Sequence, residues 1–299
     1  MRLPVGPLRG LVTFLLIAVN TVGHCAPLFT IAALKFAIPA AGWRRVASRW
    51  LVAIAESWID VNTAILRHTQ DVAWRVSGLE GLDRSRWYLV LSNHRSWVDI
   101  FAVQAVLNHR IPFLKFFIKK QLIWVPVMGL AWWALDMPFM QRHSRAYLEK
   151  YPEKRGQDLE TTRRACERFR LLPTSVITFV EGTRYTPAKH AQAKSPYRHL
   201  LPPRAGGIAF VLGAMGELFQ GLVDVTLAYP KGQGGMWDLC CGRVREIVVD
   251  VRVLPVERWL VEGDYANDPA FRERFQQWLG ELWRAKDARL ATLVGDAPG

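Results

Sequence analysis

The chain has 299 residues, of which 51% are hydrophobic, and a formal net charge of +13; this suits one substantial domain with additions and is too apolar for a typical freely soluble protein. Such a charge attracts anionic lipid, nucleic acid or an anionic substrate, but the sequence contains no helix-turn-helix, zinc-finger or RNA-binding motif. The thirteen tryptophans favour an anionic phospholipid membrane as partner, because indole concentrates where headgroups meet acyl chains, and we expect no nucleic acid.

The N-terminal region is predicted to insert into a membrane. Residues 10–34 contain no Asp, Glu, Lys or Arg, and a helix of that length can cross a hydrocarbon core of about 30 Å. A cleaved signal peptide is the disfavoured alternative, because the apolar run is longer than a usual signal core and lacks a clean cleavage site. The modest excess of basic residues after the segment places the following chain in the cytoplasm. Gly23 and Pro27 leave open whether the segment crosses once or bends into a re-entrant hairpin.

A second helix is predicted directly afterwards. Its apolar residues recur at steps of three and four and therefore share one face: Trp43, Ala47, Trp50, Ile54 and Trp58. The tryptophans predict an interfacial helix at the headgroup boundary, and the same spacing fits an ordinary amphipathic helix packed on the domain.

The remaining chain has the rhythm of an α/β domain. Strand-like runs occur at 72–76, 87–92, 175–180, 222–229 and 246–254. Helical patterns separate several of them, which predicts a mixed sheet flanked by helices, preceded by the membrane-inserted helical segment. We therefore divide the chain into residues 1–68, a membrane anchor with an interfacial helix, and residues 69–299, one folded domain.

Residues 121–140 form another apolar run, interrupted by Pro126, Gly129, Asp136 and Pro138. Prolines and an acidic side chain make a helix through lipid costly. We expect this segment to lie under the membrane or to line an acyl-chain site.

Two polar clusters, 93–99 and 179–184, follow strand-like runs. Strand ends in an α/β sheet open into a crevice where ligands bind, so the clusters predict one shared site. His94 and Asp99 are five residues apart, which would separate them on a continuous helix at 100° per residue. If His94 lies in a turn and Asp99 in the first turn of the next helix, their side chains can converge. Asp99 would then orient His94 as a base toward a hydroxyl proton.

The second cluster supplies a cation and a flexible backbone. Arg184 is expected to clamp a phosphate, because its planar fork matches phosphate geometry and Gly182 permits close backbone approach. Glu181 is expected to orient Arg184 or to bind the acceptor hydroxyl, and Thr183 to complete the pocket. No serine-hydrolase elbow or P-loop occurs, and Cys and His show no metal-ligand spacing, so we expect no metal. The two clusters together predict acyl transfer to a phosphorylated alcohol.

Four short blocks occur in an order typical of a known family. His94 and Asp99 form a His-x4-Asp motif, residues 179–184 read Phe-Val-Glu-Gly-Thr-Arg, and residues 139–142 and 225–230 supply two further blocks. This set resembles the glycerophospholipid acyltransferases, and is most similar to the bacterial inner-membrane branch related to YihG and to lysocardiolipin-type enzymes. The resemblance implies that Arg142 is a second phosphate ligand.

Two positions depart from the family pattern. Val180 replaces the usual Pro, and Arg204-Ala205-Gly206 stands where many relatives have Lys-x-Gly. Both departures bear on the identity of the acceptor more than on the type of reaction.

The resemblance implies transfer of a fatty acyl group from acyl-CoA or acyl carrier protein to the free hydroxyl of a lysophospholipid. The leading acceptor is 1-acyl-glycerol-3-phosphate, which gives phosphatidic acid, and no cofactor is expected. Lysophosphatidylglycerol or a lysocardiolipin is the alternative acceptor. A catalytically silent membrane adaptor is disfavoured because His94, Asp99, Glu181 and Arg184 occur together. The expected location is the bacterial inner membrane, with the active site on the cytoplasmic side.

Overall fold

A computed structural model describes residues 6–140, 169, 172–232 and 234–295. Its centre is a six-stranded sheet in the order β1-β8-β7-β2-β6-β3. The strands are β1 (Ala73–Ser77), β2 (Trp87–Ser92), β3 (Leu114–Phe116), β6 (Ser175–Phe179), β7 (Phe219–Ala228) and β8 (Glu246–Leu254). β7 and β8 are antiparallel and all other neighbours are parallel. The predicted mixed sheet is confirmed, and β3 is a short strand that the sequence pattern did not reveal.

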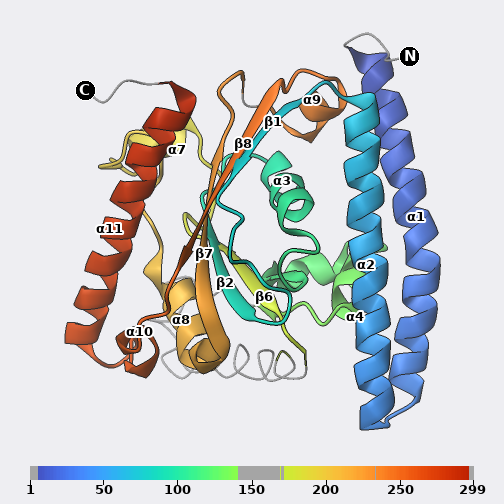
Figure 1. The fold of residues 1–299 in the computed structure, drawn as a ribbon, viewed down its shortest axis with the longest axis horizontal. Coiled ribbons are helices and arrows are strands. Elements are labelled where there is room, and N and C mark those ends of the chain that lie inside the picture. Colours follow the sequence, from blue (N-terminus) through green and yellow to red (C-terminus); the bar gives the residue numbers. More distant parts are fainter. Residues whose placement is uncertain (1–5, 141–168, 170–171, 233, 296–299) are drawn as a thin grey trace.

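Side chains that alternate along the central strand β2 build two apolar layers. Leu89 and Leu91 belong to the core formed with α8 (Ala205–Met215) and α11 (Pro269–Val294). Tyr88 and Val90 belong to the core on the opposite face, with α3 (Val98–Leu107). Figure 1 shows α8, α10 (Trp259–Glu262) and α11 on one side of the sheet, and α3 and α9 (Met236–Cys240) on the other. A continuous apolar run is expected for such a strand, because both of its faces are buried.

The α11 helix begins where the sequence signals a start. Asp268 caps it by accepting hydrogen bonds from the Ala270 and Phe271 backbone N–H groups, and Pro269 occupies the first turn, where no N–H is needed. The helix ends at Gly295 in the left-handed conformation, with φ +82°.

Two long helices lie beside the domain. α1 (Pro7–Ala37) and α2 (Ala41–Thr69) form an antiparallel hairpin, with α1 outermost (Figure 1). Asn20 Nδ2 donates to Asn62 Oδ1 across the hairpin at 2.9 Å. α1 stays helical through Gly23 and Pro27, so no re-entrant bend forms within it. Among the described residues, α1 is the helix long and apolar enough to cross a membrane.

Both ends of α1 contact the rest of the chain. Near its start, the Gly6 backbone N–H donates to the carbonyl of Cys241 at 3.1 Å. Near its end, Lys35 pairs with Asp136 at 2.5 Å. The helix therefore runs alongside the folded domain over its length.

The predicted tryptophan face of α2 is partly covered by α1 and partly exposed. Trp43 and Trp58 donate their indole N–H groups to α1, to the Leu34 carbonyl and the Thr21 hydroxyl, each at 3.0 Å. These two rings pack within the hairpin, which fits the alternative of an ordinary amphipathic helix. Trp50 remains 50% exposed.

The run at 121–140 forms short elements. They are η1 (Lys120–Trp124), α4 (Met128–Ala134) and β5 (Phe139–Met140), which pairs with β4 (Ile118–Lys119). α4 has seven residues and packs under α1 and α2 through Ala131 and Ala134. It is too short to cross a bilayer, in line with the expectation that this segment does not span one.

Candidate active site

The two polar clusters meet at one edge of the sheet. β2 and β6 are parallel neighbours with Ser92 opposite Phe179, so the residues that follow them leave the sheet together. The loops are joined by backbone hydrogen bonds, from Val180 N to Ser92 O at 3.0 Å and from Tyr185 N to His94 O at 2.7 Å. The structure thus places both polar clusters at the carboxyl ends of β2 and β6, as the sequence predicts.

His94 and Asp99 converge as the turn-then-helix arrangement requires. His94 Nδ1 lies 2.7 Å from Asp99 Oδ2, and Asp99 is fully buried in the first turn of α3. The same carboxylate oxygen accepts from the backbone N–H groups of Arg95 and Ser96, at 2.6 and 2.8 Å. These contacts fix the carboxylate before any substrate binds.

Tyr229 is the fourth donor to Asp99. Its hydroxyl lies 2.5 Å from Asp99 Oδ1. Burial, and then the neighbouring Asp99 charge, raise the pKa of Tyr229 well above its ordinary value, so its hydroxyl keeps its proton and donates. Sequence reasoning placed Tyr229 in a family block but gave it no role; its distance of 130 residues from Asp99 hid the contact.

The His94 ring also packs against an aromatic side chain. It stacks on Phe179 with centroids 4.0 Å apart and planes inclined by 17°. Since Asp99 binds Nδ1, the proton resides there and the Nε2 lone pair is available. Within the described residues, Nε2 has no hydrogen-bond partner. The arrangement can therefore remove a proton from a bound hydroxyl.

Asn93 fixes the turn that carries His94. Its side chain donates to the carbonyl of Leu227 at 2.9 Å and accepts from the Leu227 N–H at 2.8 Å. This double hydrogen bond ties the end of β2 to β7, and the buried amide leaves no backbone group of Leu227 unpaired.

Glu181 lies beside the base and does not contact Arg184. It is 1% exposed, and its Oε1 accepts from the His94 backbone N–H at 3.3 Å. Burial raises the pKa of Glu181 to about 8, opposed by the His94 hydrogen bond and the charge of Arg95. Its Oε2 is buried with no hydrogen-bond partner in the described structure. In the described structure neither carboxylate oxygen is bonded to Arg184, and both predicted roles, orientation of Arg184 and binding of the acceptor hydroxyl, stay predictions.

The predicted phosphate loop is built around Gly182. Gly182 has φ +68°, and a Cβ there would lie 2.8 Å from Arg204 Cδ, so this position favours glycine. Lys189, from α7 (Pro187–Gln192), donates to the Thr183 hydroxyl at 2.7 Å and to the Arg184 carbonyl at 3.1 Å. Lys189 was not predicted.

Arg184 lies over an exposed indole. Its guanidinium carbon is 4.4 Å from the centroid of the Trp97 ring, and Trp97 is 54% exposed. Stacking leaves the edges of the guanidinium available to a bidentate anion. Arg142, the other predicted phosphate ligand, lies outside the described residues.

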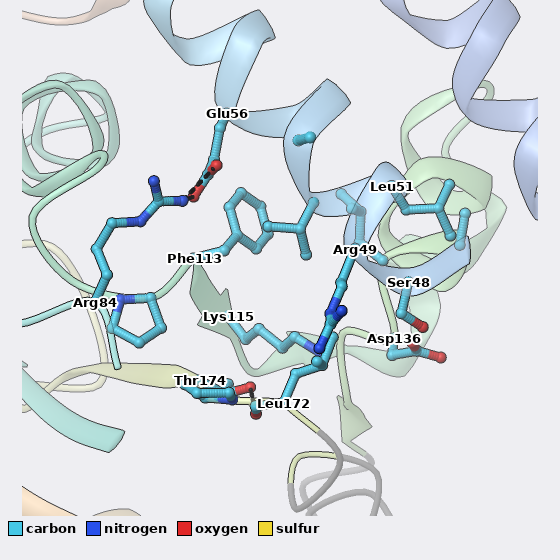
Figure 2. Close-up of a pocket in the computed structure, with 16 residues that line it drawn as sticks. Ser48, Arg49, Leu51, Glu56, Arg84, Phe113, Lys115, Asp136, Leu172 and Thr174 are labelled. Carbon is cyan, nitrogen blue, oxygen red and sulfur yellow. Dashed lines mark hydrogen bonds and ion pairs between the residues drawn. The ribbon is translucent and has the colours of Figure 1, made fainter. Parts of the chain in front are cut away.

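A separate cavity of about 360 Å³ lies away from this site (Figure 2). Residues of α2 line it together with Arg84, Pro112, Phe113, Lys115, residues 134–136 and residues 172–174, at the amino ends of β3 and β6. His94 follows the carboxyl end of β2, whereas Tyr88, near the start of β2, pairs with Ser175 at the amino end of β6, where the cavity lies. The sheet edge at His94 is the candidate active site, because a histidine, a carboxylate bound to it and an arginine lie together there.

This arrangement defines a class: an α/β protein with an aspartate-held histidine beside a glycine loop that carries an arginine, at the carboxyl edge of a mixed sheet. Residues 73–229, more than half of the chain, match the model of the Acyltransferase family. The chain belongs to that family.

Two relatives of the chain are mouse proteins. The 1-acyl-sn-glycerol-3-phosphate acyltransferase delta of Mus musculus is 27% identical over 214 residues, which are 67% of this chain and 51% of that protein. The gamma protein of Mus musculus is 26% identical over 212 residues, with the same coverage of both chains. The chain thus spans about half the length of these curated relatives.

A solved structure extends the likeness of fold. The crystal structure of the 1-acyl-sn-glycerophosphate (LPA) acyltransferase PlsC from Thermotoga maritima matches with a TM-score of 0.53 and 15% identity. The match covers 95% of this chain and 97% of PlsC, and so includes the helical hairpin as well as the sheet domain.

Proposed function

We propose that the protein transfers a fatty acyl group from acyl-CoA or acyl carrier protein to the free hydroxyl of a lysophospholipid. The leading acceptor is 1-acyl-glycerol-3-phosphate, the substrate class in the names of the relatives. The single observation that carries the proposal is the His94–Asp99 pair, held at 2.7 Å beside the Arg184 loop on one sheet edge. The proposal includes placement in the bacterial inner-membrane branch.

The reaction begins with removal of the acceptor's hydroxyl proton by His94 Nε2. The oxygen then attacks the thioester carbonyl, and the tetrahedral intermediate collapses with departure of the thiolate, which takes the proton back from His94. Asp99 stabilises the imidazolium that exists between these steps. General-base catalysis contributes ~10²–10⁴-fold, so positioning of the two substrates must supply much of the remaining acceleration. No metal or cofactor enters this sequence.

The acceptor phosphate is assigned to the Arg184 loop. The Arg184 guanidinium can bind two phosphate oxygens, and Lys189 adds a second positive charge while holding the loop backbone. Arg142 is kept as a further ligand from the family resemblance. Neutral Glu181, with an unpaired Oε2 near the base, is suited to bind the acceptor's hydroxyl.

The membrane is proposed as the source of the acceptor. α1 exposes large apolar side chains along its outer side, namely Leu8, Leu11, Phe14, Leu15, Leu16, Val19, Val22 and Leu34. Because both ends of α1 contact the folded domain, we place the helix in the interfacial region of one leaflet, the cytoplasmic side of the inner membrane. A lysolipid then needs to leave the bilayer only partly to reach His94.

The test offers labelled acyl-CoA and acyl-acyl carrier protein to the purified full-length protein with a panel of lysophospholipids. Products are resolved by mass, and His94→Ala is the matched control. We expect phosphatidic acid from 1-acyl-glycerol-3-phosphate and no product from the control. Acylation of only lysophosphatidylglycerol or a lysocardiolipin would show that the alternative acceptor is the correct one. Absence of product with every acceptor would contradict the proposal that the protein is an acyltransferase.

A further inference from the structure

The short elements before the second family block present an unusually apolar surface. Five large apolar side chains of η1, α4 and their connection are exposed: Leu122 at 38%, Trp124 at 85%, Val127 at 43%, Leu130 at 57% and Trp133 at 45%. We call these five residues the α4 surface. Single exposed apolar side chains are normal on proteins, but a contiguous group marks an interaction site.

The backbone holds this surface in place. Gly129 packs so closely on η1 that a Cβ there would lie 2.0 Å from the Ile123 carbonyl oxygen. Its N–H also donates to the Val125 carbonyl at 2.8 Å. On the inner side, Ala131 and Ala134 are buried under α1 and α2. The apolar side chains therefore project from a packed element.

The α4 surface continues the exposed face of α1. The Trp133 ring lies 6.4 Å from the ring of Phe36, which is 77% exposed in the last turn of α1. The Lys35–Asp136 ion pair ties the two elements together at the same place. Figure 1 shows α4 beside the lower half of the hairpin, on its domain side. Two elements far apart in the sequence thus form one apolar surface.

Most charges next to the α4 surface are positive, and the acidic neighbour Asp136 is paired with Lys35. Lys119 and Lys120 are exposed at its start, and residues 119–134 include no Asp or Glu. Tryptophans beside lysines are typical of a surface that meets anionic headgroups, with indole at the boundary and ammonium groups at the phosphates. A second copy of this chain is a poorer occupant, because a net charge of +13 on each copy opposes self-association.

We propose that the α4 surface is a second membrane-docking element, which inserts its tryptophans at the headgroup boundary of an anionic bilayer beside α1. A single interfacial helix leaves the domain able to roll about the helix axis. A second contact displaced from that axis prevents rolling and fixes the direction in which the His94 edge faces. This inference rests on the proposed function only in that the acceptor lies in the bilayer.

The first experiment measures docking without relying on activity. Leu130→Cys is labelled with an environment-sensitive fluorophore in the full-length protein carrying Cys25→Ala and Cys166→Ala, and Val253→Cys is the control, since Val253 is 40% exposed on β8. Vesicles contain phosphatidylethanolamine and phosphatidylglycerol at about three to one, an anionic surface of the type that attracts basic segments. We expect a blue shift and protection from aqueous iodide at position 130 and not at 253. Equal quenching by iodide at positions 130 and 253 would overturn the proposal. Protection at position 130 that appears without vesicles when the protein concentration is raised would also overturn it, because a second copy of the chain would then cover the surface.

The second experiment measures the consequence. Trp124→Ser with Leu130→Ser should reduce turnover of a bilayer-embedded acceptor at least fivefold, and change turnover of a short-chain, water-soluble acceptor less than twofold. Val76→Ser with Val253→Ser, also exposed apolar positions, should leave both unchanged. Equal losses on both acceptors would contradict an orienting role. Protection at position 130 in a protein that acylates no acceptor would leave docking standing and reject the proposed function instead.

Discussion

Asp99 is the most fully satisfied side chain of the site. All four of its contacts donate to it, from His94, Tyr229 and two backbone N–H groups. Asp99→Asn replaces an acceptor oxygen by an N–H₂ group that faces one of these donors, so His94 loses its orientation or its tautomer. We expect turnover to fall roughly 10³-fold or more, by analogy with the effect of the same change in serine-protease triads. Steady-state kinetics on a short-chain acceptor would measure this.

Tyr229→Phe is the matched comparison, because it removes one donor and leaves the His94 contact intact. We expect a loss of tenfold or less in turnover, as for a single hydrogen bond, with a stability loss of about 1–3 kcal/mol from the unpaired Asp99 Oδ1. If Asp99→Asn were no worse than Tyr229→Phe, orientation of His94 would not be the role of Asp99.

Glu181 makes stability depend on pH in a definite direction. Burial raises its pKa from 4.5 to about 8. Between these values the folded protein holds a proton that the unfolded chain has released, so stability falls as pH rises through that window and levels off above it. Glu181→Gln stays neutral and removes this contribution.

Thermal unfolding of both proteins between pH 5 and 8 measures the effect. The melting temperature of Glu181→Gln minus that of the wild type should rise with pH, since other titrating groups are common to both. Parallel curves would mean that Glu181 is charged in the folded protein at neutral pH.

At the scale of elements, the Arg184 loop and α7 act together. Lys189→Ala removes the donor to Thr183 and to the Arg184 carbonyl, and also a positive charge near the proposed phosphate site. We expect the KM for a phosphorylated acceptor to rise about tenfold, the range for a lost charge-assisted hydrogen bond, with the KM for acyl-CoA unchanged. Arg258→Ala is the control, because Arg258 is exposed and pairs with Glu262 of α10, which follows β8 at the sheet edge opposite to that of His94. A similar rise in the KM for both substrates would point to general loop damage.

Sequence patterns predict well those helices and strands that are marked by their own apolar residues or by their own capping residues. β2 is apolar on both faces, and α11 carries its Asp-Pro start, so both are visible in the sequence. β3 has three residues, two of them flanking Lys115, and forms because β6 offers it an edge. Contacts between residues far apart in the sequence are also hard to predict, because they depend on the order of the strands. Tyr229 contacts Asp99 only because of that order, whereas His94 and Asp99 are five residues apart and are brought together by one local turn.

The environment of the tryptophans on α2 also depends on a neighbouring helix. Periodicity placed Trp43, Trp50 and Trp58 together, but it could not show that α1 would cover two of them and accept their indole N–H groups. The membrane-facing residues are instead supplied by α1 and the α4 surface, where no helix of the described chain covers them.

At the scale of the whole molecule, attachment to the membrane should be apolar more than ionic. The exposed apolar side chains of α1 would be buried in the bilayer, and salt does not screen that interaction. The attraction of Lys and Arg to anionic lipids, in contrast, is screened beyond about 10 Å at 0.1 M salt. We expect the full-length protein to stay with membranes in 1 M salt and in alkaline carbonate. Fractionation of expressing cells checks this, and release by salt alone would contradict the anchoring role of α1.

The most direct measurement of the central claim is acyl transfer by His94→Ala, with labelled acyl-CoA and a short-chain lysophosphatidic acid that needs no bilayer. Because His94 is the proposed base, its loss should lower turnover by at least ~10²-fold, with the melting temperature and acyl-CoA binding of the wild type retained. Turnover within a few-fold of wild type would contradict the claim that the His94–Asp99 pair drives the reaction.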